Sequence, residues 1–390
     1  MSLISDPVRL GILGLGRAFS LSAPAIYAHP NIHIVAGADP QPEHRQNFEK
    51  AFKATSYPDI SGVLDHPDVE AVYVATPHGM HRQHAEAAIK AGKHVLVEKP
   101  LTVNIEDATA LIEAAASAGS HLIVGPSHSF DGPVQLGQQM IKAGQIGKVR
   151  MIHALYATDF LYRPRTPAEL DTSAGGGVVF SQAIHQIDVV RRLMPAHATR
   201  VYARTGGAWD PGRPTEGAYS MLIDFADNAY ATLTYSGYAH FDGDRLMEDV
   251  SELGTPKTSI HRDSRKILNE IRDELAHKTS RGFTSLADCP KASTHEHFGQ
   301  ILIFGDEGDM RLTPRGVEIS LSATRTFHEA VFRTSRAEVF DALFAAVRNH
   351  VAPVQTGVWG RASLEICHAL LASAQTEKPV PLKLQPRGSS

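Results

Sequence analysis

The first 125 residues alternate short apolar runs with segments whose apolar residues recur at helical spacing. Runs this short and this continuous are typical of strands buried on both faces of a parallel sheet. The expected strands are VRLGIL (8–13), NIHIVAGAD (31–39), VEAVYVAT (69–76), KHVLVEK (93–99) and HLIVG (121–125). Two intervening segments, 81–92 and 104–119, end in glycine, which caps a helix at little steric cost. The alternation predicts a doubly wound α/β domain, in which ligands lie beyond the carboxyl ends of the strands.

The chain is too long for a single core of ordinary size. Its 390 residues indicate two domains, which we expect at 1–127 and 128–390. Apolar and polar residues partly alternate at 148–159, 200–205, 218–227, 229–240 and 298–312, which predicts strands of a large, mostly antiparallel sheet. Helical patterns at 336–350 and 360–375 close the chain, and the charged stretch 259–282 predicts a surface helix or a lid.

The composition narrows the possible partners. A net charge of −4, with 21% charged and 43% hydrophobic residues, is typical of a globular protein and argues against nucleic acid or an anionic membrane as partner. We therefore expect a small-molecule partner. The only cysteines, Cys289 and Cys367, cannot build a disulfide framework or a four-thiolate metal site. The sequence also lacks a signal-peptide pattern and a long apolar run, so the expected location is the cytoplasm.

The segment GLGRAF follows the first predicted strand. Gly14 and Gly16 permit a tight turn and let backbone amides approach a pyrophosphate, whose charge is stabilised by the N-terminus of the next helix. The third glycine position of this pattern holds Phe19 instead. The expected cofactor contacts at the turn are Gly14, Leu15, Gly16, Arg17 and Ala18.

Asp39 ends the second predicted strand, where a carboxylate binds the adenosine ribose hydroxyls and repels a 2'-phosphate. This position favours NAD over NADP as the cofactor. Two alternatives remain open at this point. Asp39 could serve only as a turn residue before Pro40, and Arg45 could reach a phosphate.

Polar residues follow two further strands, in ATPHGMH and VEKP. The residues expected to line the cofactor edge are Thr76, Pro77, His81, Glu98 and Lys99. Lys99 is the candidate for proton transfer, because an ammonium beside cationic nicotinamide in a partly desolvated cleft has a lowered pKa. The alternatives are a solvated turn for Lys99 and a packing or capping role for His81.

These motifs, together with GGGVVFSQAIHQID downstream, resemble the Gfo/Idh/MocA oxidoreductases in order and spacing. The resemblance implies a Rossmann domain followed by an α/β domain with a large open sheet. It also implies that Lys99 is the catalytic lysine and His185 the acid–base histidine, with Ser181 where the family usually has aspartate. We expect a helix over 178–193 that places Ser181, His185 and Asp188 on one face. A buried core histidine is the alternative for His185, and the preceding glycines favour close approach to a ligand.

Segments of the second half, among them YATDFLYRPRTPAELD and GAWDPGRPTEGAY, resemble a branch of the family that acts on aromatic cis-dihydrodiols. The resemblance implies oxidation of a cyclic cis-dihydrodiol of the phthalate 4,5-cis-dihydrodiol type to a catechol. Arginines suit bidentate carboxylate binding, although a proline-rich loop can also hold them in solvent. The residues expected to contact substrate are Lys99, His128, Arg163, Arg165, Ser181 and His185. A sugar or inositol dehydrogenase and a non-catalytic NAD-binding regulator are the alternatives.

Two further expectations concern metal and assembly. His295 and His297 form an HEH pair, but zinc needs three or four ligands and neither cysteine neighbours them, so we expect no metal and assign the pair to substrate or interface contact. A broad open sheet leaves an apolar face that needs covering, which favours a homodimer or homotetramer.

Overall fold

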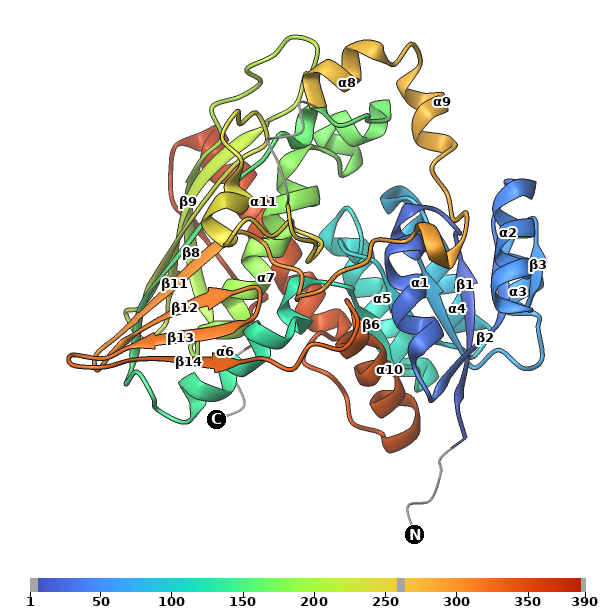
Figure 1. The fold of residues 1–390 in the computed structure, drawn as a ribbon, viewed down its shortest axis with the longest axis horizontal. Coiled ribbons are helices and arrows are strands. Elements are labelled where there is room, and N and C mark those ends of the chain that lie inside the picture. The colour runs from blue at the N-terminus through green and yellow to red at the C-terminus, as the bar shows by residue number, and fades with distance from the viewer. Residues whose placement is uncertain (1–5, 258–263, 387–390) are drawn as a thin grey trace. The chain divides into compact units, whose positions relative to one another are not determined.

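The computed structural model describes residues 6–257 and 264–386 (Figure 1). The chain forms two compact units, the first made of 1–126, 279–290 and 333–361, and the second of 127–278, 291–332 and 362–390. The first unit therefore contains the expected N-terminal segment and two later segments to which the chain returns. Residues 259–263 of the charged stretch 259–282 lie outside the described ranges, and the described part of the stretch contains two short helices.

The first unit is built on a six-stranded parallel sheet in the order β3-β2-β1-β4-β5-β6. The strands are β1 (Val8–Leu13), β2 (Ile32–Ala38), β3 (Thr55–Tyr57), β4 (Ala71–Val74), β5 (His94–Val97) and β6 (Leu122–Val124). Leu13 is in register with Ala38 on one side and Val74 on the other, and Val74 with Val97. The carboxyl ends of four strands are therefore level, and the residues that follow them share one edge. The predicted doubly wound sheet is confirmed.

Helices connect these strands. They are α1 (Arg17–Ala28), α2 (Pro42–Phe52), α3 (Ile60–Leu64), α4 (His81–Lys90), α5 (Ile105–Ala118) and, after the second unit, α10 (Ala337–Asn349). Asn104 caps α5 by accepting the Asp107 N–H at 2.8 Å, and Gly119 ends this helix in the left-handed conformation. Helix α11 (Gly357–Thr376) contributes its first residues to the first unit and the remainder to the second.

The second unit is built on a nine-stranded sheet in the order β14-β13-β12-β11-β7-β10-β9-β8-β15. The strands are β7 (Val149–Ala157), β8 (Ala198–Arg204), β9 (Ala218–Phe225), β10 (Tyr230–Ser236), β11 (Gln300–Gly305), β12 (Asp309–Thr313), β13 (Gly316–Ser320), β14 (Arg325–Glu329) and β15 (Val380–Pro381). Only β7 and β10 pair in parallel. The expected large, mostly antiparallel sheet is confirmed.

Burial alternates along the central strands of this sheet. On β7, Ile152, Ala154 and Tyr156 are buried, whereas Met151, His153 and Leu155, which alternate with them, are half-buried. One face of the sheet thus carries the core, and the other retains accessible apolar groups. The helices of this unit are α6 (Gly132–Lys142), α7 (Ile184–Leu193), α8 (Ser264–Glu270) and α9 (Glu274–Thr279).

Short helical turns complete the two units. They are the 3-10 helices η1 (His78–Met80), η2 (His128–Phe130), η3 (Phe160–Tyr162), η4 (Pro167–Leu170), η5 (Thr172–Ala174), η7 (Gly243–Met247) and η8 (Leu286–Asp288), and the π-helix η6 (Val179–Ala183). Within the described ranges, none of the helices combines the length and apolar character that crossing a membrane requires.

Candidate active site

The glycine-rich turn lies between β1 and α1 at the level edge of the parallel sheet. Gly14 has a φ of +95°, and a Cβ there would approach the Ala75 carbonyl oxygen to 2.8 Å, so only glycine fits. A Cβ at Gly16 would meet no heavy atom within 4 Å among the described residues. Because α1 starts directly after Gly16, the N–H groups of its first turn lie next to this turn. This turn fits the pyrophosphate of a dinucleotide.

Phe19 stands at the third glycine position because it belongs to an aromatic cluster. Its ring is fully buried and lies 5.9 Å from the Phe48 ring and 5.3 Å from the Phe283 ring, measured between centroids. The Phe283 N–H also donates to the Leu15 carbonyl at 2.8 Å. Segment 279–290 therefore packs beside the glycine-rich turn within the first unit, a contact that local sequence patterns do not reveal.

The Asp39 carboxylate organises the same turn. Its Oδ2 accepts the Leu15 N–H at 2.9 Å, and its Oδ1 accepts the Gln41 N–H at 2.8 Å. His44 Nδ1 lies 3.2 Å from Oδ1, and Arg45 donates to the Asp39 carbonyl at 2.8 Å. Asp39 is therefore both a turn residue and a fixed negative charge beside the dinucleotide turn, where it fits the ribose of NAD.

His81 joins the two loops that follow β4 and β5. The side chain is buried, with Nδ1 2.8 Å from the Pro100 carbonyl oxygen and Nε2 2.9 Å from the Thr76 carbonyl oxygen. His84 Nδ1 lies 3.0 Å from the Thr76 hydroxyl. Burial lowers the pKa of His81, and a neutral imidazole donates to only one of the two carbonyls at a time. His81 thus links the backbone of Thr76 to the backbone of Pro100, the residue that follows Lys99.

Glu98 and Lys99 follow β5 at the level edge. Glu98 is buried and accepts the Tyr73 hydroxyl at 2.7 Å, while burial raises the pKa of Tyr73 well above its usual value. Lys99 is half-buried. The structure thus brings the glycine-rich turn, Asp39, Thr76 and the EKP segment to one edge of one sheet, as the strand register requires.

His185 lies in a compact cluster of rings in the second unit. Its ring stacks on Phe298 at 4.8 Å and meets the edge of the His128 ring at 4.8 Å, between centroids. His128 Nδ1 lies 2.7 Å from Asp131 Oδ2, which orients that imidazole. Two residues expected to contact substrate, His128 and His185, are therefore neighbours. Asp131 and Phe298 complete the cluster, and sequence patterns gave no signal for either.

The helix carrying His185 differs from the expected continuous α-helix over 178–193. It begins with the π-helix η6, which contains Ser181, and becomes α-helical at Ile184. Glu216 accepts the Val179 N–H at 3.2 Å at the start of this helix. A π-turn has i to i+5 hydrogen bonds, so Ser181 and His185 are not related by the regular α-helical repeat that was expected, and such turns are frequent at functional sites.

Gly176 and Gly177, which precede this helix, lie so close to neighbouring parts of the chain that a side chain would not fit at either position. A Cβ at Gly176 would overlap the Ala168 carbonyl oxygen, and a Cβ at Gly177 would overlap the Glu216 carboxylate. The absence of side chains at these two glycines therefore lets the chain pack closely against Ala168 and Glu216. Asp188, on the same helix, accepts the Ser127 hydroxyl at 2.5 Å.

Arg163 and Arg165 already hold carboxylates of the chain. Arg163 contacts Glu252 at 2.7 Å and Asp159 at 3.2 Å, and Arg165 contacts Glu169 at 3.2 Å. Burial disfavours the Arg163 cation, but Glu252 and Asp159 outweigh this cost and raise its pKa, whereas burial lowers the pKa of Arg165.

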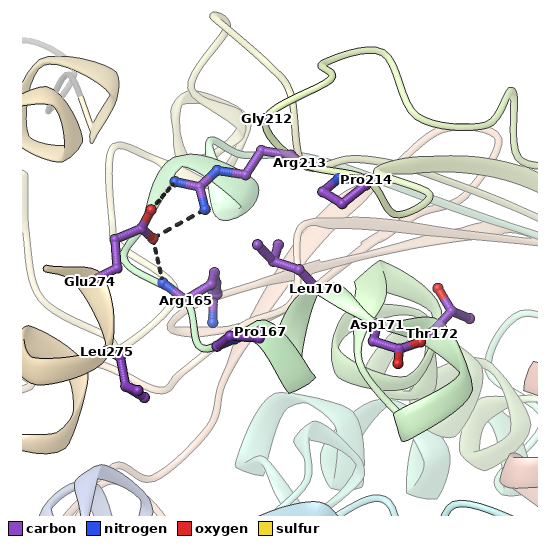
Figure 2. Close-up of a pocket in the computed structure, with 10 residues that line it drawn as sticks. All are labelled: Arg165, Pro167, Leu170, Asp171, Thr172, Gly212, Arg213, Pro214, Glu274 and Leu275. Atoms are coloured by element: carbon purple, nitrogen blue, oxygen red, sulfur yellow. Dashed lines mark hydrogen bonds and ion pairs between the residues drawn. The ribbon is translucent and has the colours of Figure 1, made fainter.

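A cavity of about 660 Å³ opens in the second unit (Figure 2). It is lined by Arg165, Pro167, Leu170, Asp171, Thr172, Gly212, Arg213, Pro214, Glu274 and Leu275. A cavity of this size accommodates a small ring compound. Of the two arginines expected to bind substrate, Arg165 is part of the lining.

His295 and His297 are both buried, and burial lowers the pKa of each. His297 Nε2 donates to the Val250 carbonyl at 2.9 Å and Nδ1 accepts the Gly299 N–H at 3.1 Å, while the His295 ring packs against Phe332. Across residues 6–257 and 264–386, no three or more His, Cys, Asp or Glu side chains gather in a way that could hold a metal ion.

Models of protein families match both halves of the chain. Residues 8–126 match the oxidoreductase family with an NAD-binding Rossmann fold, and residues 134–251 match the GFO/IDH/MocA C-terminal domain. The expected NAD cofactor is thereby confirmed.

Individual relatives extend this match over nearly the full chain. The 1-carboxy-3-chloro-3,4-dihydroxycyclohexa-1,5-diene dehydrogenase of Comamonas testosteroni is 41% identical, over 95% of this chain and 96% of the relative. The myo-inositol 2-dehydrogenase of Thermotoga maritima is 30% identical over 50% of this chain and 58% of the relative. The crystal structure of a protein assigned as a dehydrogenase, from Bordetella bronchiseptica RB50, superposes with a TM-score of 0.92 at 36% identity, covering 96% of this chain and all of that one.

Proposed function

Because the chain belongs to the GFO/IDH/MocA family of NAD-binding oxidoreductases, we propose that it oxidises a carboxylated cyclic cis-dihydrodiol to the corresponding catechol. The observation that carries the proposal is the match to the Comamonas testosteroni enzyme, whose name describes a carboxylated dihydroxycyclohexadiene. The match extends over 95% of this chain and 96% of that enzyme.

The reaction needs one hydride acceptor and groups that move protons. The chemistry that NAD supplies when bound is acceptance of a hydride from the carbinol carbon. The hydroxyl proton on the same carbon leaves to a base, which gives a ketone. The ketone then transfers a ring proton to its oxygen and becomes a catechol. Aromatisation drives this last step.

We assign the proton transfers to Lys99 and His185. Lys99 follows β5 at the cofactor edge of its unit and is half-buried, and an amine at this edge can exchange a proton with a bound substrate. His185 is held between Phe298 and His128, so its imidazole keeps a defined orientation. Lys99 belongs to the first unit and His185 to the second.

The remaining substrate contacts are proposed on the same basis. The proposed set is Lys99, His128, Arg163, Arg165, Ser181 and His185, and the proposed NAD contacts are those at the glycine-rich turn, Asp39, Thr76, Pro77, His81, Glu98 and Lys99. Among the arginines, Arg165 lines the cavity, which supports its place in the set.

An inositol dehydrogenase is the second candidate, supported by the match to the Thermotoga maritima enzyme over half of the chain. Its substrate is a neutral polyol, which does not require a cavity lined by arginines. A non-catalytic NAD-binding regulator is disfavoured because such a protein needs neither Lys99 nor His185.

We also propose a homo-oligomer in the cytoplasm that does not bind nucleic acid. Met151, Leu155, Leu222 and Leu302 lie half-buried on the face of the large sheet opposite its core, where a second copy would cover them. Both cysteines are buried as free thiols, as a reducing compartment allows, and the net charge is −4.

The test is a substrate panel with purified protein and NAD. The panel contains a cis-dihydrodiol of a benzoate or phthalate, the same diol without carboxylate, myo-inositol and an aldose. We expect NADH formation with the carboxylated dihydrodiol and a catechol as the identified product. Preference for myo-inositol or the aldose would replace the proposal with the second candidate.

A further inference from the structure

We propose that Arg213 determines specificity by binding the substrate carboxylate, and that the Glu274 carboxylate occupies this position in the structure. The inference rests on the proposed function, which it deepens by naming the recognition group. Arg213 lies in the segment GRPTEGAY before β9, and Glu274 opens the short helix α9.

The contact has the geometry of a bidentate carboxylate clamp (Figure 2). Arg213 Nη1 donates to Glu274 Oε2 at 3.1 Å, and Nη2 donates to Oε1 at 3.0 Å. The backbone N–H of Arg165 donates to the same Oε2 at 3.0 Å. Three N–H donors thus converge on one carboxylate, and this arrangement suits any carboxylate that reaches it.

The two partners differ in exposure. The Arg213 side chain is 6% exposed and the Glu274 side chain 30% exposed. Arg213 is therefore a fixed part of the wall, whereas its carboxylate partner comes from the solvent side. A buried guanidinium needs a partner, because leaving such a charge unpaired is costly. A substrate carboxylate satisfies that need, and a neutral diol does not.

Helix α9 has a second attachment that does not involve Arg213. Lys278 Nζ contacts Glu169 Oε1 at 2.7 Å. This ion pair can hold α9 while Glu274 leaves the clamp. Exchange of Glu274 for a substrate carboxylate therefore does not require the helix to detach.

The clamp belongs to a wall that continues to the helix carrying His185. Thr172, which lines the cavity, bonds the Thr215 hydroxyl at 2.9 Å and also the Glu216 carboxylate. Glu216 in turn accepts the Val179 N–H at the start of that helix. The wall that carries Arg213 is thus joined by hydrogen bonds to the element that carries Ser181 and His185.

Arg163 offers an internal comparison. It holds Glu252 and Asp159, much as Arg213 holds Glu274, but it is absent from the residues that line the cavity. Removing the Glu252 carboxylate would leave Arg163 paired with Asp159, whereas removing the Glu274 carboxylate would take away the carboxylate that Arg213 holds. The pair of variants Glu274→Gln and Glu252→Gln therefore distinguishes the two arginines.

The experiment is calorimetric binding of 3,4-dihydroxybenzoate and of catechol to the full-length protein with NADH, as probes with and without carboxylate. We expect Arg213→Leu to weaken 3,4-dihydroxybenzoate binding about ten- to hundredfold and to leave catechol binding unchanged. Arg213→Lys should keep part of the affinity, since it retains the charge without the fork. Glu274→Gln should strengthen 3,4-dihydroxybenzoate binding several-fold, and Glu252→Gln should leave it unchanged.

Contrary results are equally specific. The inference is overturned if Glu274→Gln leaves the affinity for 3,4-dihydroxybenzoate unchanged or weakens it. It is also overturned if Glu252→Gln strengthens this affinity instead, or if neither the wild type nor Glu274→Gln binds 3,4-dihydroxybenzoate. Should Arg213→Leu fail to fold, the binding affinities of Glu274→Gln, Glu252→Gln and Arg213→Lys test the inference instead. Because binding is measured without turnover, a clamp that works in a protein inactive on dihydrodiols would refute the proposed function alone.

Discussion

The cofactor edge of the first unit and the cavity of the second are built on different principles. At the edge, backbone groups at level strand ends form the site, and Gly14 and Asp39 fix its shape through contacts with neighbouring main chain. In the cavity, charged side chains from distant segments meet as ion pairs, such as Arg213 with Glu274. A backbone site depends on a few obligatory residues. A side-chain site can change its ligand through one substitution.

The largest effect is expected at the edge. Lys99→Met keeps most of the bulk of the stem and removes the proton carrier, so turnover should fall by about 10²- to 10⁴-fold. NAD affinity should remain near that of the wild type, as measured by fluorescence titration. Near-normal turnover in this variant would return Lys99 to the role of a solvated turn residue.

Asp39→Ala tests whether the edge selects the cofactor. The variant loses a carboxylate that is positioned by two backbone N–H groups. NAD should bind about ten- to hundredfold more weakly, the range for hydrogen bonds to a charged group. The ratio of kcat/KM with NADP to kcat/KM with NAD should rise in the variant. An unchanged ratio would mean that Asp39 shapes the turn without reading the ribose.

Glu169→Gln tests the ion pairs beside the cavity through pH. Burial alone would raise the pKa of Glu169, but Arg165 and Lys278 outweigh it and hold the pKa at about 2, below the ordinary 4.5. A carboxyl whose pKa is lower in the folded state than in the unfolded state stabilises the fold at pH values above its unfolded-state pKa. The wild type should therefore exceed the variant by up to about 3 kcal/mol in free energy of unfolding near neutral pH. This difference should shrink as pH falls below about 4.5 towards 2, as followed by urea denaturation. If the difference in free energy of unfolding did not depend on pH, it would arise from packing and not from the charge of Glu169.

Leu222→Glu should have the smallest effect on chemistry. It places a charge on the half-buried face of the large sheet, at a residue that does not line the cavity. We expect a shift from oligomer to monomer in sedimentation velocity, with turnover per chain nearly retained. A wild type that sediments as a monomer at micromolar concentration would contradict the proposed assembly.

The contrast between the two sites also explains what the sequence could predict. β1 matches the predicted run 8–13, because parallel buried strands require continuous apolar residues. β3 was missed since its three residues, Thr55–Tyr57, carry no apolar run. β13 and β14 lie at one end of the large sheet, where partial exposure weakens the alternation.

Site residues follow the same division. The glycine-rich turn and Asp39 sit at fixed intervals from a strand, so a local pattern reveals them. The Arg213–Glu274 pair and the packing of Phe19 on Phe283 join residues far apart in the chain. Neither leaves a local signal. The π-turn at Ser181 also escaped prediction, since its composition resembles that of an α-helix.

The most direct test of the proposed function is kcat/KM with NAD for a carboxylated cis-dihydrodiol, compared with the same diol without its carboxylate and with myo-inositol. The proposed function predicts the highest value for the carboxylated diol, by about tenfold or more if one charged hydrogen-bonded contact distinguishes them. A higher value for myo-inositol would contradict it.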